Sequence, residues 1–316
     1  MGANFIDISF VAPCFNEEAA LHRFYEEITR IASALNENGQ ASTCELIFVD
    51  DGSVDATASI LRDFALRDER VRYLIFSRNF GKEAALLAGL RKARGRYVVT
   101  LDADLQDPPS LIPEMLAAVA SGEFDCAGTR RITRKGEPAI RSFFARRFYQ
   151  IMAKLTDIEV VDGARDFRLM SRSYVNAVLS LNERIRFSKG IFPWVGFRSK
   201  WFEYENIRRA TGETKWSFGK LFLYSLDGIF AFSSKPLAIA SILGILFFLL
   251  SLAFIAMIIF RRIIWGDPVD GWASTACIIL FCSGVQLFTT GILGQYLAKV
   301  YEEIKQRPHY IVREEK

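Results

Sequence analysis

The stretch that decides the fold is YVVTLDADLQDP, residues 97–108. A short run of apolar and β-branched residues ends at Leu101, and three aspartates follow within the next six positions. Such a run is typical of a buried strand that opens into a polar loop. In an open parallel sheet, ligands bind beyond the carboxyl ends of the strands. The stretch therefore predicts a central strand that ends at a ligand-binding edge.

The same pattern recurs on both sides of this stretch. Further apolar, β-rich runs predict strands, which gives the set 8–12, 45–49, 72–76, 97–101 and 125–129. Amphipathic segments alternate with them and predict helices at 17–36, 55–66, 82–92 and 108–120. Strands and helices that alternate at this spacing indicate a mostly parallel sheet wrapped by helices, so the expected fold class is α/β.

Polar loops follow the first four predicted strands and should converge at one edge. They read PCFNEE at 13–18, DDGSVD at 50–55, SRNFGK at 77–82 and DADLQD at 102–107. Taken singly, each loop is explained better by a turn or a helix cap. Two acidic pairs at neighbouring strand ends, however, repel each other unless a cation or hydrogen-bond donors compensate them. We therefore expect a bound metal ion at this edge.

The ligands available for that ion are oxygen atoms. Asp102 and Asp104 are two residues apart, so in continued strand geometry both face one ion, with Gln106 next in register. Only two histidines and five cysteines occur, without a C-x-x-C pair, which excludes a histidine-rich or cysteine-rich zinc site. Mg²⁺ or Mn²⁺ is therefore expected, with coordination positions left for phosphate oxygens.

The expected ligand is a nucleotide sugar. The sequence has no G-x-x-x-x-G-K-[ST] loop and no G-x-G-x-x-G after the first predicted strand. These absences argue against a P-loop NTPase and against a dinucleotide oxidoreductase. The net charge of +4 is also too small to suggest a nucleic-acid partner.

Two long uncharged runs predict a membrane hairpin. They cover 236–260 and 273–297, and each would reach about 37 Å as a helix, enough for a bilayer core of about 30 Å. The alternative is two buried helices of a soluble core, which their length and the lack of a polar stripe disfavour. Basic residues flank both outer ends of the hairpin, which places those ends in the cytoplasm. We expect an integral membrane protein whose large amino-terminal part lies in the cytoplasm.

This interpretation divides the chain into six parts. They are a catalytic domain at 1–215, a juxtamembrane amphipathic helix at 216–235, a first membrane helix at 236–260, an extracytoplasmic loop at 261–272, a second membrane helix at 273–297 and a cytoplasmic tail at 298–316. Small residues in the second membrane helix, among them Gly284 and Gly291, permit close helix packing and suggest a homo-oligomer. Lipid-facing glycine without a packing role is the alternative.

An ordered set of motifs carries a resemblance to a known family. The motifs are PxxNE at 13–17, DDGS at 50–53, NxGK at 79–82, DADLQDP at 102–108, DFRL at 166–169 and GETKW at 212–216. Followed by two spans, this order resembles the family 2 glycosyltransferases, and within them the polyprenyl-phosphate hexosyltransferases. Bacterial bactoprenol glucosyltransferases are most similar, and dolichol-phosphate mannose synthases are more distant. The resemblance implies a GT-A fold and inverting transfer of one hexose, best taken from UDP-glucose, to undecaprenyl phosphate for cell-envelope glycan modification such as that of O-antigen.

The resemblance also implies roles for individual residues. The nucleotide-sugar set is Pro13, Asn16, Glu17, Asp50, Asp51, Ser53, Lys82 and Asp102, and the metal set is Asp102, Asp104 and Gln106. Arg130 and Arg141 would hold the acceptor phosphate. The catalytic set is Asp104, Asp166, Arg209 and Lys215, of which the last two would close over the donor phosphates.

Several alternatives stay open at this stage. Asp166 could orient a sugar hydroxyl or the acceptor, act as a base, or pair with Arg165 or Arg168. A processive polysaccharide synthase is disfavoured because the chain lacks an Arg-Trp pair and has only two predicted spans. A catalytically silent nucleotide-sugar sensor or membrane scaffold is the second competitor. The donor could also be UDP-N-acetylglucosamine or another sugar nucleotide.

Overall fold

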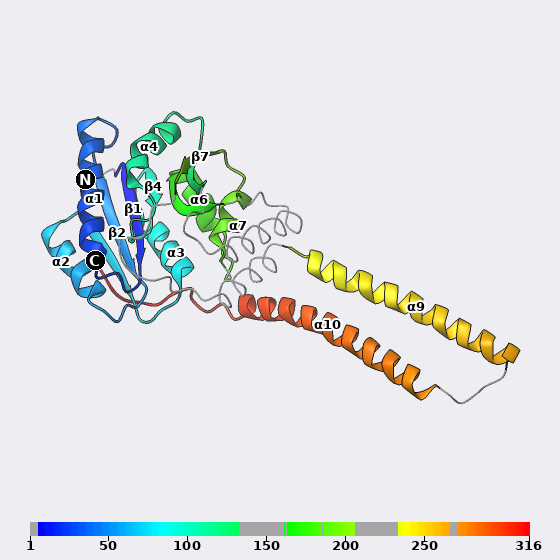
Figure 1. Cartoon of the computed structure of the whole chain (residues 1–316). Helices are drawn as coiled ribbons and strands as arrows, with labels where there is room; N and C mark the ends of the chain where they lie inside the picture. Colours follow the sequence, from blue (N-terminus) through cyan, green and yellow to red (C-terminus); the bar gives the residue numbers. More distant parts are fainter. Residues whose placement is uncertain (1–5, 133–160, 162, 185, 206–232, 266–270) are drawn as a thin grey trace.

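A computed structural model describes residues 6–132, 161, 163–184, 186–205, 233–265 and 271–316 (Figure 1). Its centre is an eight-stranded sheet with the strand order β7-β5-β6-β4-β1-β2-β3-β8. The strands are β1 (Ile8–Cys14), β2 (Cys44–Asp50), β3 (Val71–Phe76), β4 (Tyr97–Thr100), β5 (Cys126–Arg131), β6 (Ala164–Ser171), β7 (Ser199–Tyr204) and β8 (Val312–Glu315).

The first four strands form the parallel half of the sheet. β1 pairs in parallel with β2 and with β4, and β2 pairs in parallel with β3. All five strand predictions are confirmed within about two residues at each end. The fifth one, β5, does not continue the parallel half, because β6 lies between β4 and β5 and runs antiparallel to both. The DFRL motif at 166–169 is therefore part of a central strand.

Helices cover both faces of the sheet. The shorter ones are α1 (Leu21–Glu37), α2 (Thr57–Arg67), α3 (Lys82–Lys92), α4 (Ile112–Ala120), α6 (Arg172–Ser180) and α7 (Ser188–Trp194), with a 3₁₀ turn at Pro109–Leu111. Phe10 of β1 packs with α1, α2 and α4, whereas its neighbour Val11 packs with α3, α6 and α7 on the opposite face. This alternation is the two-residue period expected of a strand that is buried on both sides.

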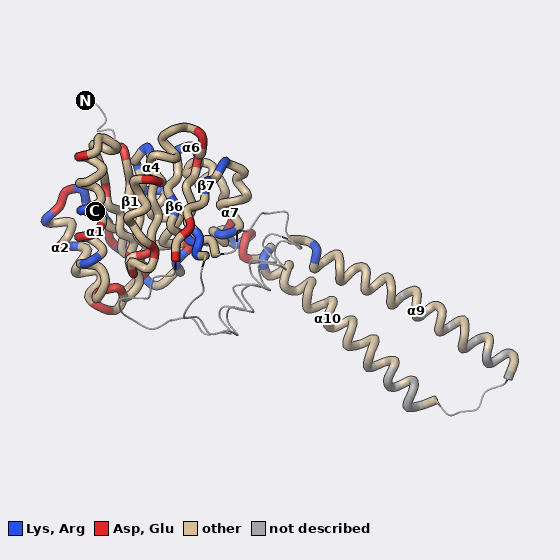
Figure 2. Tube along the Cα trace, turned by 45° about the horizontal axis from the view of Figure 1, so that its top comes forward, with Lys and Arg blue, Asp and Glu red and all other residues tan. Residues whose placement is uncertain are grey.

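Two helices of more than thirty residues extend from the sheet domain (Figure 1). They are α9 (Lys235–Trp265) and α10 (Trp272–Ile304), and they contain the predicted spans 236–260 and 273–297. Among the described residues, one helical segment, Lys235–Phe254, is long and apolar enough to cross a membrane. Figure 2 shows that charged residues are abundant on the sheet domain and sparse along both helices. The predicted juxtamembrane helix lies almost entirely outside the described residues.

The predicted cytoplasmic tail carries a strand that the sequence patterns did not indicate. After α10, the chain returns to the sheet, and β8 pairs antiparallel with β3. Glu314 of β8 accepts hydrogen bonds from Arg62 (2.9 and 2.7 Å) and from the hydroxyl of Tyr73 (2.8 Å). Tyr310 stacks on Phe76, with ring centroids 4.9 Å apart. The end of the chain is thus an edge strand of the sheet domain.

Candidate active site

Hydrogen bonds tie the loops after β1 and β2 to each other. The Asp50 carboxylate accepts from the backbone N–H of Ser53 (3.0 Å) and from its hydroxyl. The Ser53 oxygen in turn accepts from the N–H of Asn16 (2.9 Å), and the Asn16 side chain accepts from the N–H of Val54 (3.0 Å). Asn16 has a φ of 53°, a left-handed conformation that asparagine tolerates better than most residues. The structure therefore brings Asn16, Asp50 and Ser53 together at the carboxyl ends of β1 and β2.

Asp51 connects the loop after β2 to the loop after β3. It is 3% exposed and accepts from the N–H groups of Phe80 (2.7 Å) and Gly81 (2.9 Å). Burial raises the pKa of Asp51, and these two hydrogen bonds oppose the rise. Gly52 has a φ of +70°, and a Cβ there would lie 2.4 Å from the carbonyl carbon of Arg78. Asp51 thus supports the turn that precedes Lys82, and its contact with a nucleoside stays a prediction.

Lys82 joins two carboxylates from different strands. Its Nζ lies 2.7 Å from Asp102, which follows β4, and 2.6 Å from Asp166 on β6. Burial raises the pKa of Asp166, but the nearby positive charges outweigh it and the pKa is lowered. Desolvation depresses the pKa of Lys82, but the two carboxylates outweigh it and raise it. The Lys82 side chain is 42% exposed, so this cluster is open to a ligand.

The acidic loop after β4 differs from the expected extended register. β4 ends at Thr100, a turn follows at positions 103–104, and Leu105 has a φ of 54°. The Asp104 carboxylate accepts from the N–H of Gln106 (3.2 Å), and the Gln106 side-chain oxygen accepts from Arg131 (3.0 Å). The expectation that Gln106 continues the register of the two aspartates is therefore wrong, because the turn sends its side chain toward β5.

Asp107 forms a second cluster behind this loop. It is 5% exposed, and its carboxylate accepts from Arg165 (3.0 Å) and from the hydroxyl of Tyr204. Arg131 lies 3.6 Å from the same carboxylate. Burial and the Asp107 charge raise the pKa of Tyr204. Asp107 therefore holds the acidic loop against β6 and β7, whereas the sequence alone suggested a helix start at this position.

The donors around these carboxylates change the argument for a metal ion. Backbone N–H groups compensate Asp51, the Ser53 N–H and hydroxyl compensate one oxygen of Asp50, and Lys82 pairs with Asp102. The second oxygen of Asp50 is buried without a hydrogen bond from any described residue. Among the described residues, no group of three or more His, Cys, Asp or Glu side chains is placed to hold a metal ion. Electrostatic repulsion therefore does not by itself require a cation here. Asp102 and Asp104 remain oxygen ligands of the kind that Mg²⁺ or Mn²⁺ takes together with phosphate oxygens, although the strand register expected to direct both toward one ion ends at Thr100.

The other predicted residues divide into two groups. Pro13 lies at the end of β1, the N–H of Glu17 donates to the Thr57 hydroxyl (2.9 Å), and Arg130 of β5 pairs with Glu203 of β7. Arg141, Arg209 and Lys215 lie outside the described residues, so their predicted roles stay predictions.

Sequence reasoning missed several residues of this site. Arg165 was considered only as a possible partner of Asp166, and Tyr204 was missed, because both reach the site from strands that the apolar runs did not reveal. Glu83 was missed although it directly follows Lys82, and its carboxylate accepts from the N–H of Ser188 (3.0 Å). The acidic residue in the first turn of a predicted helix was the available signal for Glu83.

Comparisons with known proteins agree with the motif order. The family described as Glycosyl transferase family 2 matches residues 9–179. A glycosyltransferase of Synechocystis sp., named as uncharacterized, is 42% identical over 97% of this chain and 95% of its own length. The bactoprenol glucosyl transferase of Shigella phage SfV is 38% identical over 98% of this chain and 99% of its own length.

A solved structure is also similar, at lower identity. The glucosyl-3-phosphoglycerate synthase of Mycobacterium tuberculosis, in complex with phosphoglyceric acid, is 21% identical, with 71% of this chain and 78% of that chain covered and a TM-score of 0.45. The family match covers more than half of the sequence, and the relatives match nearly end to end. The parallel half-sheet with its acidic loops is therefore the GT-A-like core of a glycosyltransferase, and this chain belongs to glycosyltransferase family 2.

Proposed function

We propose that this enzyme transfers one glucose unit from UDP-glucose to undecaprenyl phosphate, with inversion at the anomeric carbon, for cell-envelope glycan modification. The observation that carries the proposal is the full-length similarity to relatives named bactoprenol glucosyl transferase. These matches cover 97–98% of this chain, so they extend beyond the catalytic core through α9 and α10. The two long helices of this chain lie within the matched length and support a lipid-linked acceptor.

The chemistry of the acceptor suits the charges of the site. A phosphate monoester has its second pKa near 6, so at pH 7 its oxygen is already largely an anionic nucleophile. Such an acceptor needs positioning and charge neutralisation more than deprotonation. Arg130 and Arg141 would hold this phosphate, and Arg209 with Lys215 would bind the donor phosphates. We assign Asp166 an orienting role, because its carboxylate is already ion-paired with Lys82.

A divalent cation is part of this proposal. Asp102 and Asp104 would hold Mg²⁺ or Mn²⁺, and the bound ion would neutralise negative charge on the donor diphosphate. Gln106 is left out of the ligand set, because its side-chain oxygen accepts from Arg131. Asn16, Asp50, Ser53 and Asp51 would shape the nucleotide side of the same edge.

We place the enzyme in the bacterial inner membrane, with α9 and α10 crossing as a hairpin and the catalytic domain in the cytoplasm. A polyprenyl chain leaves the bilayer at a cost of about 0.8 kcal/mol per CH₂ group. An enzyme that acts on its phosphate must therefore work at the membrane surface. Lys235–Phe254 of α9 supports this placement by its length and composition.

The test is transfer from labelled donors to extracted lipid. Membranes that contain the enzyme are incubated with undecaprenyl phosphate and with radiolabelled UDP-glucose, UDP-N-acetylglucosamine or GDP-mannose, with and without chelator. We expect label in the lipid fraction with UDP-glucose, lost on chelation. Label confined to a soluble or polymeric product would refute the lipid acceptor, and lipid label from another donor would replace glucose. Asp104→Asn should abolish the transfer and leave membrane insertion unchanged.

A further inference from the structure

Glu83 links the start of α3, which carries Lys82, to the start of α7. It is the second residue of α3, directly after Lys82, and its carboxylate accepts from both the N–H and the hydroxyl of Ser188. Ser188 is the first residue of α7 and is 5% exposed, and Phe187 before it provides no side-chain cap. The first turn of α3 therefore carries Lys82 into the site and also holds the start of α7.

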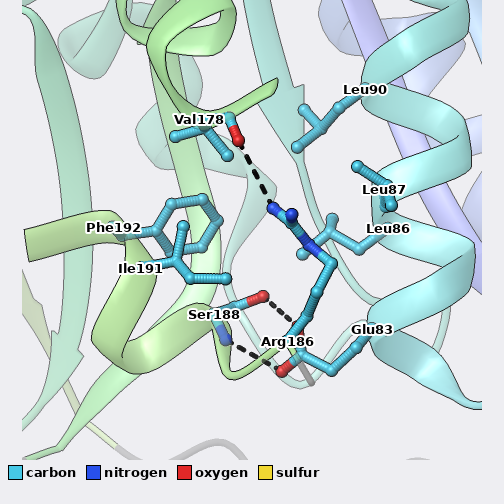
Figure 3. A pocket seen from close by; sticks show the side chains of 9 residues that line it. All are labelled: Glu83, Leu86, Leu87, Leu90, Val178, Arg186, Ser188, Ile191 and Phe192. Carbon is cyan, nitrogen blue, oxygen red and sulfur yellow. Dashed lines mark hydrogen bonds between the residues drawn. The ribbon is translucent and has the colours of Figure 1, made fainter. Parts of the chain in front are cut away.

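The segment around this contact is fixed on its other sides as well. Figure 3 shows the Arg186 side chain running between apolar side chains of α3 and those of α6 and α7, with Glu83 beside its base. The Arg186 guanidinium donates to the carbonyl of Leu181 (2.7 Å) and to that of Val178 at the end of α6. Farther along α7, the Phe192 ring lies 4.6 Å from the guanidinium of the buried Arg168 on β6. Helix α7 is thus held at both ends.

The contacts of Ser188, Arg186 and Phe192 determine where the backbone of Lys189 lies. Lys189 follows Ser188, so the two Glu83 hydrogen bonds fix its backbone beside the Lys82 end of α3. Burial raises the pKa of Asp166, whereas the charges of Lys82 and Lys189 both lower it. The positive charges of two lysines from different elements therefore act on one carboxylate. Helix α7 packs on β6, and β6 pairs with β5, which carries Arg130. Lys189 therefore belongs to a helix that packs on β6, next to β5, and β4 separates β6 from β1 and β2.

We propose that Lys189 binds the acceptor phosphate and that Glu83 is a positioning residue that holds Lys189 in place through Ser188. The inference rests on the proposed function, because it assumes that the acceptor is a phosphate monoester. A phosphate of nearly two negative charges at pH 7 requires several cations, and the charge of Lys82 is already shared by two carboxylates. An ammonium from α7 would add a charge-assisted contact beside β6, the strand that pairs with Arg130-bearing β5.

The test measures the effect of each substitution on donor and acceptor separately. Lys189→Ala, Lys189→Arg, Ser188→Ala and Glu83→Ala are prepared in the full chain, with Lys200→Ala as the matched control. Lys200 is an exposed lysine on β7, over the rings of Phe124 and Phe202. KM for UDP-glucose, KM for undecaprenyl phosphate and kcat are measured for each variant, and UDP binding with thermal unfolding reports on the fold.

We expect Lys189→Ala to raise KM for the acceptor about tenfold or more and KM for the donor less than twofold. Lys189→Arg should recover most of the loss, and Lys200→Ala should behave as the unmodified enzyme. Ser188→Ala and Glu83→Ala should raise KM for the acceptor in the same direction while UDP binding persists. An unchanged KM for the acceptor in Lys189→Ala would overturn the inference. Equal increases of KM for donor and acceptor, in a variant that still binds UDP, would overturn it as well. If the unmodified enzyme itself transfers nothing to the lipid phosphate, the proposed function fails instead.

Discussion

Lys82 is the residue on which the geometry of the site depends most. Its ammonium lies between Asp102, in the loop after β4, and Asp166 on β6, and the two carboxylates would otherwise repel each other. An exposed ion pair contributes little to stability, typically less than about 1 kcal/mol. The Lys82 side chain is 42% exposed, so its main effect should be on the arrangement of the carboxylates.

Replacing Lys82 by alanine should therefore impair transfer far more than folding. We expect kcat to fall by about 100-fold, in the range seen when one preorganised charge is removed from an active site. The thermal midpoint should shift by only a few degrees. Steady-state transfer assays and thermal unfolding in detergent measure both quantities. A large loss of stability with normal kcat in the remaining folded enzyme would contradict this assignment.

Asp107 should show the opposite behaviour. Asp107 is 5% exposed, and its carboxylate accepts from Arg165 and Tyr204, so its removal takes a buried partner from the half-buried Arg165 and from the buried Tyr204 hydroxyl. Breaking a buried pair in this way typically costs about 3–5 kcal/mol. We expect Asp107→Ala to lower the thermal midpoint strongly. The control is Asp63→Ala, which removes an exposed pair with Arg67 on α2 and should change stability by less than about 1 kcal/mol. Equal effects of the two variants would refute the structural role of Asp107.

These residues also show how far the sequence could lead. Asn16, Asp50, Ser53 and Lys82 were found because they follow apolar strand runs, and the structure brings their loops to one edge. The orientation of Gln106 could not be predicted, because it depends on a left-handed residue at Leu105 that no local pattern marks. The partners of Asp107 come from positions about 60 and 100 residues away, and only the folded sheet brings them near.

Among the elements, the strands differ in how plainly the sequence indicates them. β1 to β4 are buried on both faces and therefore read as continuous apolar runs. β6 begins with Ala-Arg-Asp, and β8 reads Val-Arg-Glu-Glu, so neither has an apolar run. Their positions are decided by contacts with distant strands, such as the pairing of β8 with β3. Tertiary contacts of this kind override local preference.

At the amino-terminal end of β2, away from the active-site loops, Glu45 connects β2 to three neighbouring segments. It is 2% exposed and accepts from the Ser9 hydroxyl (2.7 Å), Arg72 (2.9 Å) and the N–H of Arg94 (2.7 Å). Burial raises the pKa of Glu45, but these hydrogen bonds outweigh it, and the pKa is lowered. The carboxylate therefore stabilises the fold in its ionised form.

This shift predicts a pH dependence with a defined sign. Because the folded pKa lies below the unfolded value of about 4.3, the stabilisation is complete above that pH and is lost as the pH falls below it. We expect the thermal midpoint of the unmodified enzyme to drop between about pH 5 and pH 3 more steeply than that of Glu45→Gln. Thermal unfolding across this pH range measures the difference. Parallel pH profiles for the two proteins would exclude Glu45 as a source of the acid sensitivity.

At the scale of the whole molecule, the chain ties its long helices back to the sheet domain. Only residues 305–311 connect α10 to β8, and seven residues span at most about 24 Å. The N–H of Arg184 also donates to Glu303 near the end of α10 (2.8 Å). The Ser77 N–H donates to the carbonyl of Ile311 (2.9 Å), immediately before the loop that carries Lys82. The active-site edge is thus held close to the helix end that we place at the membrane surface.

If this attachment sets the distance between the site and the bilayer, loosening β8 should affect only an acceptor that is embedded in a membrane. Arg62 holds β8 through its ion pair with Glu314. Hydrogen bonds from Arg62 and Tyr73 lower the pKa of Glu314 to about 2. Glu314→Arg places two arginines against each other and should release the strand. We expect transfer to undecaprenyl phosphate in vesicles to fall about tenfold or more, and transfer to a short-chain, water-soluble prenyl phosphate to change less than twofold. The charge-swapped pair Arg62→Glu with Glu314→Arg should restore vesicle activity. Equal losses with both acceptors would mean that β8 supports the folded sheet rather than its position at the membrane.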